Sequence, residues 1–153
     1  MEQNPFTHIL VPTDGSDTSI NAGLLAIQIA NTHRAKLTFV YVVDQIVVEG
    51  IASTTSKSTE AICKELESKG QRYLDYLSRM ARDTGLQTDQ AILHGIPHRE
   101  IAELARESRG DLIVIGQVGS HGLQRAHIGS VAERVIESAP CPVLVVRHTP
   151  IRR

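Results

Sequence analysis

The sequence predicts a single α/β domain in which a doubly wound, five-stranded parallel sheet has helices on both faces. Five short runs rich in Val, Ile and Leu alternate with segments in which apolar residues recur every three or four positions, the spacing of a helix with one buried face. Several runs are continuously apolar, which is typical of parallel strands buried on both sides. Because 153 residues suit one domain, we expect residues 1–153 to form a single unit.

A polar turn separates the first predicted strand from the first predicted helix. Residues 8–11, His-Ile-Leu-Val, end at the turn formers Pro-Thr-Asp-Gly-Ser. Residues 17–32 then place apolar side chains at positions i, i+4 and i+7, which predicts a helix. Either Ser16 or Asp17 can begin this helix by accepting hydrogen bonds from its first N–H groups.

The middle of the chain predicts a strand, a loop and a charged helix. Residues 36–43 are rich in β-branched and aromatic side chains and predict the second strand. Residues 44–58 have no clean period and include a Ser/Thr-rich stretch, so we expect a long loop. Whether that loop is a lid, a dimer contact or a mobile segment stays open. A helix is expected over residues 59–84, with Gly85 just past its end.

The last third of the chain predicts two further βα units and a final strand. Residues 87–93 form a weaker third strand, and Pro97 opens the next helix, where its missing N–H does no harm. Residues 111–115 are an unbroken apolar strand, followed by a glycine-rich loop. Ser130 is expected to cap and start a helix with Val131 and Val135 facing inward. Residues 143–146 are the last strand.

Composition argues against several classes of protein. A net charge of −1, 3% aromatic residues and no Lys/Arg run disfavour nucleic acid as a partner. The longest apolar stretches fall far short of the ~18 residues of a membrane span, and the N-terminus does not look like a secretory signal, so we expect a cytoplasmic protein that does not enter a membrane. Two cysteines, Cys63 and Cys141, are too few for a disulfide framework and are expected to be reduced and partly buried.

The glycine-rich loop is the strongest sign of a binding site. Glycines stand at positions 116, 119, 122 and 129, between the end of a strand and the start of a helix. Backbone without Cβ atoms can approach a ligand closely, and successive N–H groups near a helix N-terminus favour phosphate. The loop lacks the Gly-Lys-Ser/Thr of a Walker A motif, and the dinucleotide fingerprint is absent from the first strand–helix turn. Without further context, the glycines are equally compatible with plain turns.

The loop and several other motifs resemble the universal stress protein family, and specifically its ATP-binding branch. The pattern Gly-x2-Gly-x9-Gly-Ser is met by Gly116, Gly119, Gly129 and Ser130. Further matching motifs run in order through nearly the whole chain: Val-Pro-Thr-Asp-Gly-Ser, Tyr-Val-Val-Asp, His-Gly-Ile-Pro, Asp-Leu-Ile-Val-Ile-Gly and Cys-Pro-Val-Leu-Val-Val-Arg. The resemblance implies strand order 3-2-1-4-5, with ATP in the crevice where the loops after strands 1 and 4 diverge. Ligands of open α/β sheets occupy such switch points.

The same resemblance implies a set of nucleotide-binding residues. Pro12, Thr13 and Asp14 would line the adenosine end, while Val42 meets the adenine and Ile115 packs on the nucleoside. The residues implied around the ribose and phosphates are Gly116, Gly119, Gly129, Ser130 and Val131. Two departures from the family pattern, Gln117-Val118 and Ser120 in place of a cation, leave AMP as acceptable a ligand as ATP. Mg²⁺ would come with the phosphates, because few protein groups typically hold it.

Other chemistry has weaker support in the sequence. His94 and His98 are four residues apart, but Gly95 and Pro97 break the helix that would align them as metal ligands, so we expect no metal site made by protein groups alone. Ser130, Asp14 and a loop histidine could be drawn as a catalytic triad, yet the hydrolase elbow Gly-x-Ser-x-Gly is missing. We therefore assign no catalytic residue, and the expected activity is at most a weak ATPase.

Three hypotheses about function remain. The first is an adenine-nucleotide-binding regulatory protein of the stress response, which acts by shifting between conformations and needs no catalysis. The second is a slow ATPase or nucleotidyl-transfer enzyme that uses the same pocket. The third is a nucleotide-free interaction module. The family resemblance implies a homodimer through the last strand, made of Val143, Leu144, Val145 and Val146, while any other protein partner is left unidentified.

Overall fold

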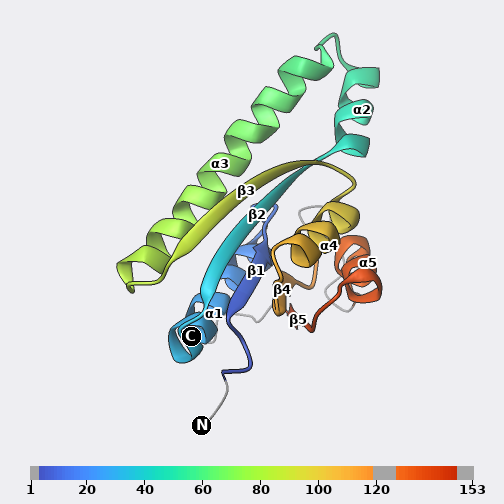
Figure 1. Ribbon diagram of the computed structural model, residues 1–153. Coiled ribbons are helices and arrows are strands. Elements are labelled where there is room, and N and C mark those ends of the chain that lie inside the picture. The colour runs from blue at the N-terminus through green and yellow to red at the C-terminus, as the bar shows by residue number, and fades with distance from the viewer. Residues whose placement is uncertain (1–3, 119–126, 148–153) are drawn as a thin grey trace.

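The structure, a computed structural model, describes residues 4–118 and 127–147 and contains one five-stranded sheet of order β3-β2-β1-β4-β5 (Figure 1). Each neighbouring pair of strands is parallel. The strands are β1 (His8–Pro12), β2 (Lys36–Asp44), β3 (Thr88–Gly95), β4 (Leu112–Gly116) and β5 (Val143–Val146). The predicted fold class and strand order are therefore confirmed.

Helices cover both faces of the sheet. They are α1 (Asp17–His33), α2 (Gln45–Thr54), α3 (Thr59–Asp83), α4 (Pro97–Glu107) and α5 (Ser130–Ser138). α1 and α3 pack on one face, and α4 and α5 pack against each other on the opposite face (Figure 1). The connections after β1 and β4 therefore leave the sheet toward opposite sides.

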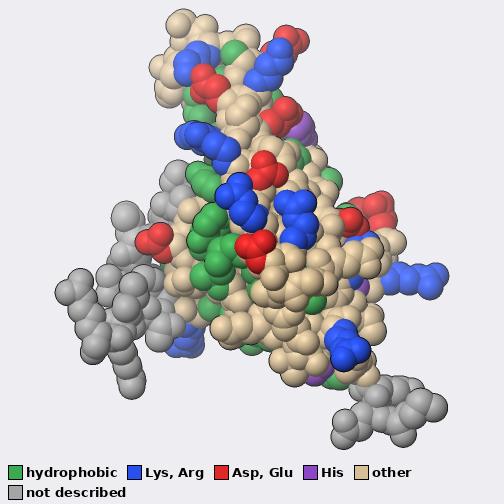
Figure 2. Space-filling view, turned by 90° about the vertical axis from the view of Figure 1, so that its left-hand side faces the viewer, with side chains coloured by type: hydrophobic (Ala, Val, Ile, Leu, Met, Phe, Trp, Pro, Cys, Tyr) green, Lys and Arg blue, Asp and Glu red, His purple; other side chains and the backbone are tan. Residues whose placement is uncertain are grey.

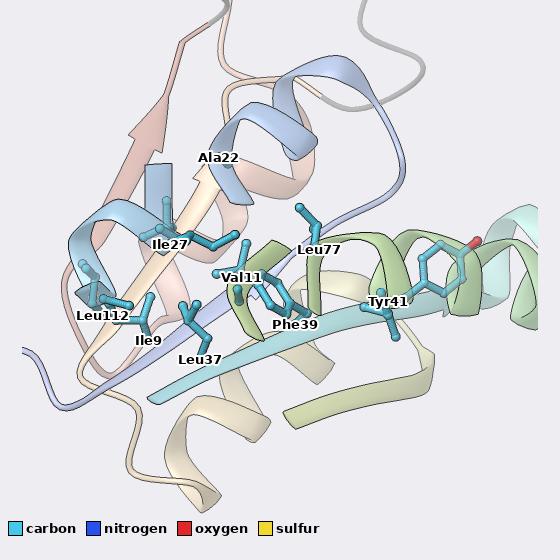
Figure 3. Close-up of a cluster of buried hydrophobic side chains, with 14 of the residues drawn as sticks. Ile9, Val11, Ala22, Ile27, Leu37, Phe39, Tyr41, Leu77 and Leu112 are labelled. Carbon is cyan, nitrogen blue, oxygen red and sulfur yellow. The ribbon is translucent and has the colours of Figure 1, made fainter. Parts of the chain in front are cut away.

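Side chains point alternately to the two faces of the sheet along each strand, and this divides the core into two layers. In β1, Ile9 and Val11 face α1 and α3, whereas Leu10 faces α4 and α5. Figure 3 shows the first layer, in which Phe39 of β2 lies near Leu77 of α3. Because successive side chains of a strand point to opposite faces, a strand buried on both sides must be apolar at nearly every position. This explains the unbroken apolar runs of the sequence.

Local capping signals set several helix boundaries as expected. Ser16 is the N-cap of α1, where its Oγ accepts a hydrogen bond from the Ser19 N–H at 3.3 Å. Pro97 occupies the first turn of α4. Gly85, just beyond the C-cap of α3, has a φ of 87°, in the left-handed region that glycine adopts at low cost.

Residues 44–58 were expected to form a loop, and that prediction is wrong because they contain the helix α2. The carboxylate of Asp44 caps this helix, with Oδ1 accepting from the Ile46 N–H at 2.9 Å. Val48 is buried in the first core layer, and Ile51 and Ala52 pack against it one turn later. The helix propensity of this segment is weak, because it contains Ile-Val-Val, Gly50 and a Ser/Thr run. Burial of its apolar side chains against the core therefore outweighs the conformational preference of the local sequence.

The start of α5 also differs from expectation. Gly129 is the N-cap and Ser130 is the first helical residue, without a side-chain capping hydrogen bond. Val131 is 38% exposed, so it does not face inward, whereas Ala132 and Val135 are buried. Residues 132 and 135 lie three positions apart on one face, and residue 131 is rotated about 100° away from residue 132. The predicted inward position of Val135 is confirmed.

The side of the molecule that includes α3 has a mixed surface. Figure 2 shows Lys and Arg side chains interspersed with Asp and Glu there, around smaller hydrophobic areas. Among the helices of residues 4–118 and 127–147, none is both long and apolar enough to cross a bilayer.

Candidate functional site

The candidate site lies at the carboxyl ends of β1 and β4, which are neighbours in the middle of the sheet. The chain leaves β1 toward α1 on one face and leaves β4 toward α5 on the other. This is a topological switch point, where the diverging loops of an open α/β sheet leave a crevice for ligands. The turn after β1 and both ends of the glycine-rich loop meet here.

Thr13 fastens the turn after β1 to its surroundings. Its N–H donates to the Val40 carbonyl at 2.8 Å, which continues the pairing of β1 with β2. Its buried Oγ1 shares a 2.9 Å hydrogen bond with Ser19 Oγ and accepts one from the Gly15 N–H at 3.2 Å. Pro12, immediately before it, is the buried last residue of β1. Thr13 therefore has a structural role, and its side chain ties the turn to α1.

Asp14 shapes the same turn and remains exposed. Its Oδ1 accepts from the Ser16 N–H at 3.0 Å, an arrangement that short acidic side chains commonly make in turns. Burial raises the pKa of the Tyr41 hydroxyl, and the nearby Tyr73 hydroxyl and Asp14 carboxylate raise it further. Asp14 thus has the turn role that its type suggests, and it also places a negative charge near Tyr41.

Gly116 lets β4 approach the first turn of α1 closely. A Cβ atom at this position would lie 2.8 Å from the Thr18 carbonyl carbon and 2.9 Å from the Ser19 nitrogen, both backbone atoms that cannot move aside cheaply. Thr18 Oγ1 also donates to the Val118 carbonyl. A side chain at position 116 would therefore push the glycine-rich loop away from the turn that carries Asp14.

Gln117 closes the base of the glycine-rich loop, a role that the sequence did not reveal. Its side-chain amide is buried and donates from Nε2 to the His127 carbonyl at 3.2 Å, while the backbone carbonyl of Gln117 accepts from the Gly129 N–H at 2.6 Å. Its own N–H donates to Val146 of β5 at 2.8 Å. The only sequence signal for this role was a glutamine directly after an apolar strand, and the partner of its side chain is ten residues away.

The N-terminus of α5 faces this closed loop base. Gly129 holds the N-cap position, and Ser130 and Val131 are exposed in the first turn. Since the N-cap residue Gly129 has no side chain to cap the helix, the N–H groups of the first turn are suited to a ligand anion, which the positive end of the helix dipole also favours. Gly119 of the expected set lies outside the described residues.

Val42 and Ile115 belong to the core layer on the α4–α5 face. Ile115 is buried in the cluster that contains Leu10 and Ile113, and Val42 is half-buried against the same cluster. They lie near the ends of β2 and β4, on either side of β1. Hydrogen bonds and packing therefore connect Thr13, Gly116 and Gly129, whereas these two residues contribute an apolar wall.

His94 and His98 lie on different elements, the end of β3 and the start of α4. His94 Nε2 lies 2.8 Å from Glu67 Oε1 of α3, and His98 sits in the first turn of α4. No group of three potential metal ligands occurs among the residues that the structure describes.

Cys63 and Cys141 are both half-buried free thiols, as predicted. Burial, and then the nearby Asp111 carboxylate, raise the pKa of Cys141 and so keep its thiol protonated at neutral pH.

A doubly wound sheet with a glycine-rich loop at its switch point defines an α/β protein of the ligand-binding type. The model of the universal stress protein family matches residues 5–147, and the chain belongs to this family. The universal stress protein MJ0531 of Methanocaldococcus jannaschii is 42% identical over 145 residues, covering 95% of this chain and 84% of that relative.

Two solved structures share the fold over most of their length. MJ0577 of the same organism superposes with a TM-score of 0.82 at 26% identity, covering 95% of this chain and 98% of the other. A universal stress protein in complex with cAMP has a TM-score of 0.66 at 27% identity, with coverage of 93% and 97%.

Proposed function

We propose that this chain is a regulatory protein of the stress response that binds AMP or ATP at the switch point between β1 and β4. The observation that carries the proposal is the N-terminus of α5, whose N-cap residue Gly129 has no side chain, held beside the close contact of Gly116 with α1. A similar structure is a complex with cAMP, which shares with AMP and ATP the adenine base and a phosphate on the ribose.

The arrangement suggests how each part of a nucleotide would be held. The backbone N–H groups of Ser130 and Val131 would receive the phosphates. Gly129, whose own N–H donates to the Gln117 carbonyl, would let the phosphates approach closely, as would the loop backbone at Gly116 and Gly119. Asp14, with Pro12 and Thr13 behind it, would line the adenosine. Val42 would meet the adenine, with Ile115 packed in the same cluster. Aliphatic contacts fit a chain with 3% aromatic residues.

Binding fits the described residues better than catalysis. Phosphoryl transfer needs cations that neutralise the developing charge, and the described ends of the glycine-rich loop carry Gln117, Val118 and His127 in place of a lysine or arginine. Mg²⁺ would be held mainly by the phosphates. Any ATPase activity is expected to be weak.

Titration calorimetry with AMP, ATP and cAMP tests the proposal. We expect saturable binding by the wild-type chain, and loss of binding in Gly116→Ala, because the new methyl group would collide with the backbone of α1. Gly50→Ala is the matched control, since nothing lies within 4 Å of a Cβ at that position. If the wild type binds none of the three nucleotides at millimolar concentration, the proposal is wrong.

A homodimer through β5 is the second part of the proposal. β5 is an edge strand, and its Leu144 is 37% exposed. Further half-exposed apolar side chains belong to α5 and the residues before it: Ile128, Val131 and Ile136. An unpaired edge with apolar neighbours favours pairing across a two-fold axis. A dimer that carries no nucleotide through purification and binds none would favour the interaction module.

A further inference from the structure

The ring of Tyr73, on α3, lies directly against the turn that carries Asp14. A Cβ atom built on Gly15 would overlap three atoms of this ring, so the ring occupies the space that a side chain would fill. Gly15 also has a φ of 83°, a conformation that L side chains rarely adopt. The turn therefore reaches its observed shape only with glycine at this position, where the Tyr73 ring packs directly against the backbone.

A second aromatic ring anchors Tyr73 to the sheet. Tyr41 of β2 is buried, and its ring centroid lies 6.3 Å from that of Tyr73 at an interplanar angle of 49°. A Cβ at Gly70, one turn before Tyr73, would overlap the Tyr41 ring, so α3 sits unusually close to β2 here. Burial and the neighbouring Tyr73 and Asp14 all raise the pKa of Tyr41, which shows that these groups share one small region.

The contact with Gly15 is separable from the general packing of α3. Leu74, Leu77 and Ala81 are fully buried and hold the helix on the sheet. Leu77 also packs closely against Gly23 of α1. Tyr73 is only half-buried and packs at the margin of this core, whereas Leu74, Leu77 and Ala81 are fully buried within it.

We propose that Tyr73 is a positioning residue for the nucleotide site, because its ring holds the Asp14–Gly15 turn and couples nucleotide binding to the docking of α3. The inference rests on the proposed function. Coupling between two sites is reciprocal, so a nucleotide that favours the observed turn also stabilises α3 against local opening. The stability of α3 against local opening therefore depends on whether a nucleotide occupies the site.

Affinity for AMP in three variants tests the positioning role. Tyr73→Ala is expected to weaken binding about tenfold, a typical size for such coupling. Tyr73→Phe keeps the ring and should bind like the wild type. Tyr76→Ala is the matched control, because Tyr76 lies on the same helix and is 47% exposed. If Tyr73→Ala does not fold, Tyr73→Leu replaces it, since leucine keeps apolar bulk without the flat ring. Unchanged affinity, or an equal loss in Tyr73→Phe, overturns the proposal.

Hydrogen exchange provides the readout that a purely structural role would not move. AMP should slow exchange of the α3 amides over residues 70–77 in the wild type but not in Tyr73→Ala, while protection at residues 129–132 persists in both at saturating AMP. Protection of α3 in both proteins would overturn the coupling. If the wild type binds no nucleotide, the proposed function fails separately. In that case, hydrogen exchange at residues 15–19 without ligand tests whether Tyr73 positions the turn. Faster exchange in Tyr73→Ala than in the wild type supports the positioning role, and equal rates overturn it.

Discussion

Asp111 connects the two central strands at the end of the sheet opposite the candidate site. Its Oδ2 accepts hydrogen bonds from the N–H and Oγ1 of Thr7, at 2.8 and 2.7 Å, and its Oδ1 accepts from the His8 N–H at 3.0 Å. Partial burial opposes ionisation, but these hydrogen bonds outweigh it and lower the pKa of Asp111. One carboxylate therefore ties the start of β1 to the start of β4.

We expect Asp111→Asn to lower the free energy of unfolding by about 1 kcal/mol at pH 7, because an amide offers one acceptor oxygen where the carboxylate offers two. Since the folded pKa lies below the unfolded value of about 3.9, the contribution is fully present above that pH. It disappears as the pH falls through the lowered folded pKa. Urea denaturation of both proteins from pH 7 to pH 3 measures the difference.

A gap between the two proteins that stayed constant down to pH 3 would contradict this account. AMP affinity is the internal control. Asp111 lies at the amino end of the sheet, so the substitution should leave binding at the carboxyl end unchanged.

Residue-scale prediction from sequence succeeded where the signal and its partner are neighbours in the chain. Ser16 and Pro97 mark helix starts through contacts within one turn, which the local sequence contains. Gln117 and Tyr73 act on partners 10 and 58 residues away. Helical periodicity places Tyr73 on the apolar face of its helix, but it does not reveal the contact of the ring with Gly15. Ser130 was misplaced by one residue because serine and glycine are both acceptable N-caps.

At the scale of elements, α2 shows what sequence periodicity misses. Its residues have weak helix propensity, and a ten-residue helix is marginal alone, so its apolar face depends on β2 and α3 being already in place. The continuous apolar strands and the strongly amphipathic α3 carry their own pattern and were predicted to within a few residues. Tertiary contact, which a single sequence does not display, accounts for the difference.

Val48→Ala should loosen α2. Val48 is the one buried residue of this helix, and removing two methyl groups from the core costs about 2 kcal/mol. Hydrogen exchange over residues 45–54 should accelerate strongly while exchange in β2 changes little. Ile46→Ala is the matched control, since Ile46 is 66% exposed and its truncation should leave exchange nearly unchanged. Equal acceleration by both substitutions would show that α2 is not held by Val48.

At the scale of the molecule, the two edges of the sheet differ in character. β3 ends the sheet on one side with polar side chains such as Asp89, Gln90 and His94 exposed. β5 ends it on the other side with only Val143–Val146, which are apolar and partly exposed. The strand order, implied by the family resemblance, is confirmed, and it is this order that leaves β5 at an edge.

The proposed dimer predicts that Leu144→Arg yields a monomer, because a buried, unpaired guanidinium at the two-fold interface would cost more than the contact contributes. Light scattering coupled to gel filtration should give twice the mass of the chain for the wild type and one mass for the variant. Tyr76→Arg is the control, because Tyr76 is an exposed residue of α3, and this variant should remain a dimer. A monomeric wild type at micromolar concentration would refute the β5 dimer.

The central position of β1 also determines the order in which the chain can fold while it is being synthesised. β1 can pair with β2 once residue 44 has been made, but its other edge waits for β4, whose Leu112 pairs with Ile9. At about 5 to 20 residues per second, the ribosome needs roughly 5 to 20 s to go from Ile9 to Leu112. Throughout that interval the middle strand of the finished sheet is an open edge, and open edges recruit other chains. We therefore expect the nascent chain to be most prone to aggregation before β4 has been made.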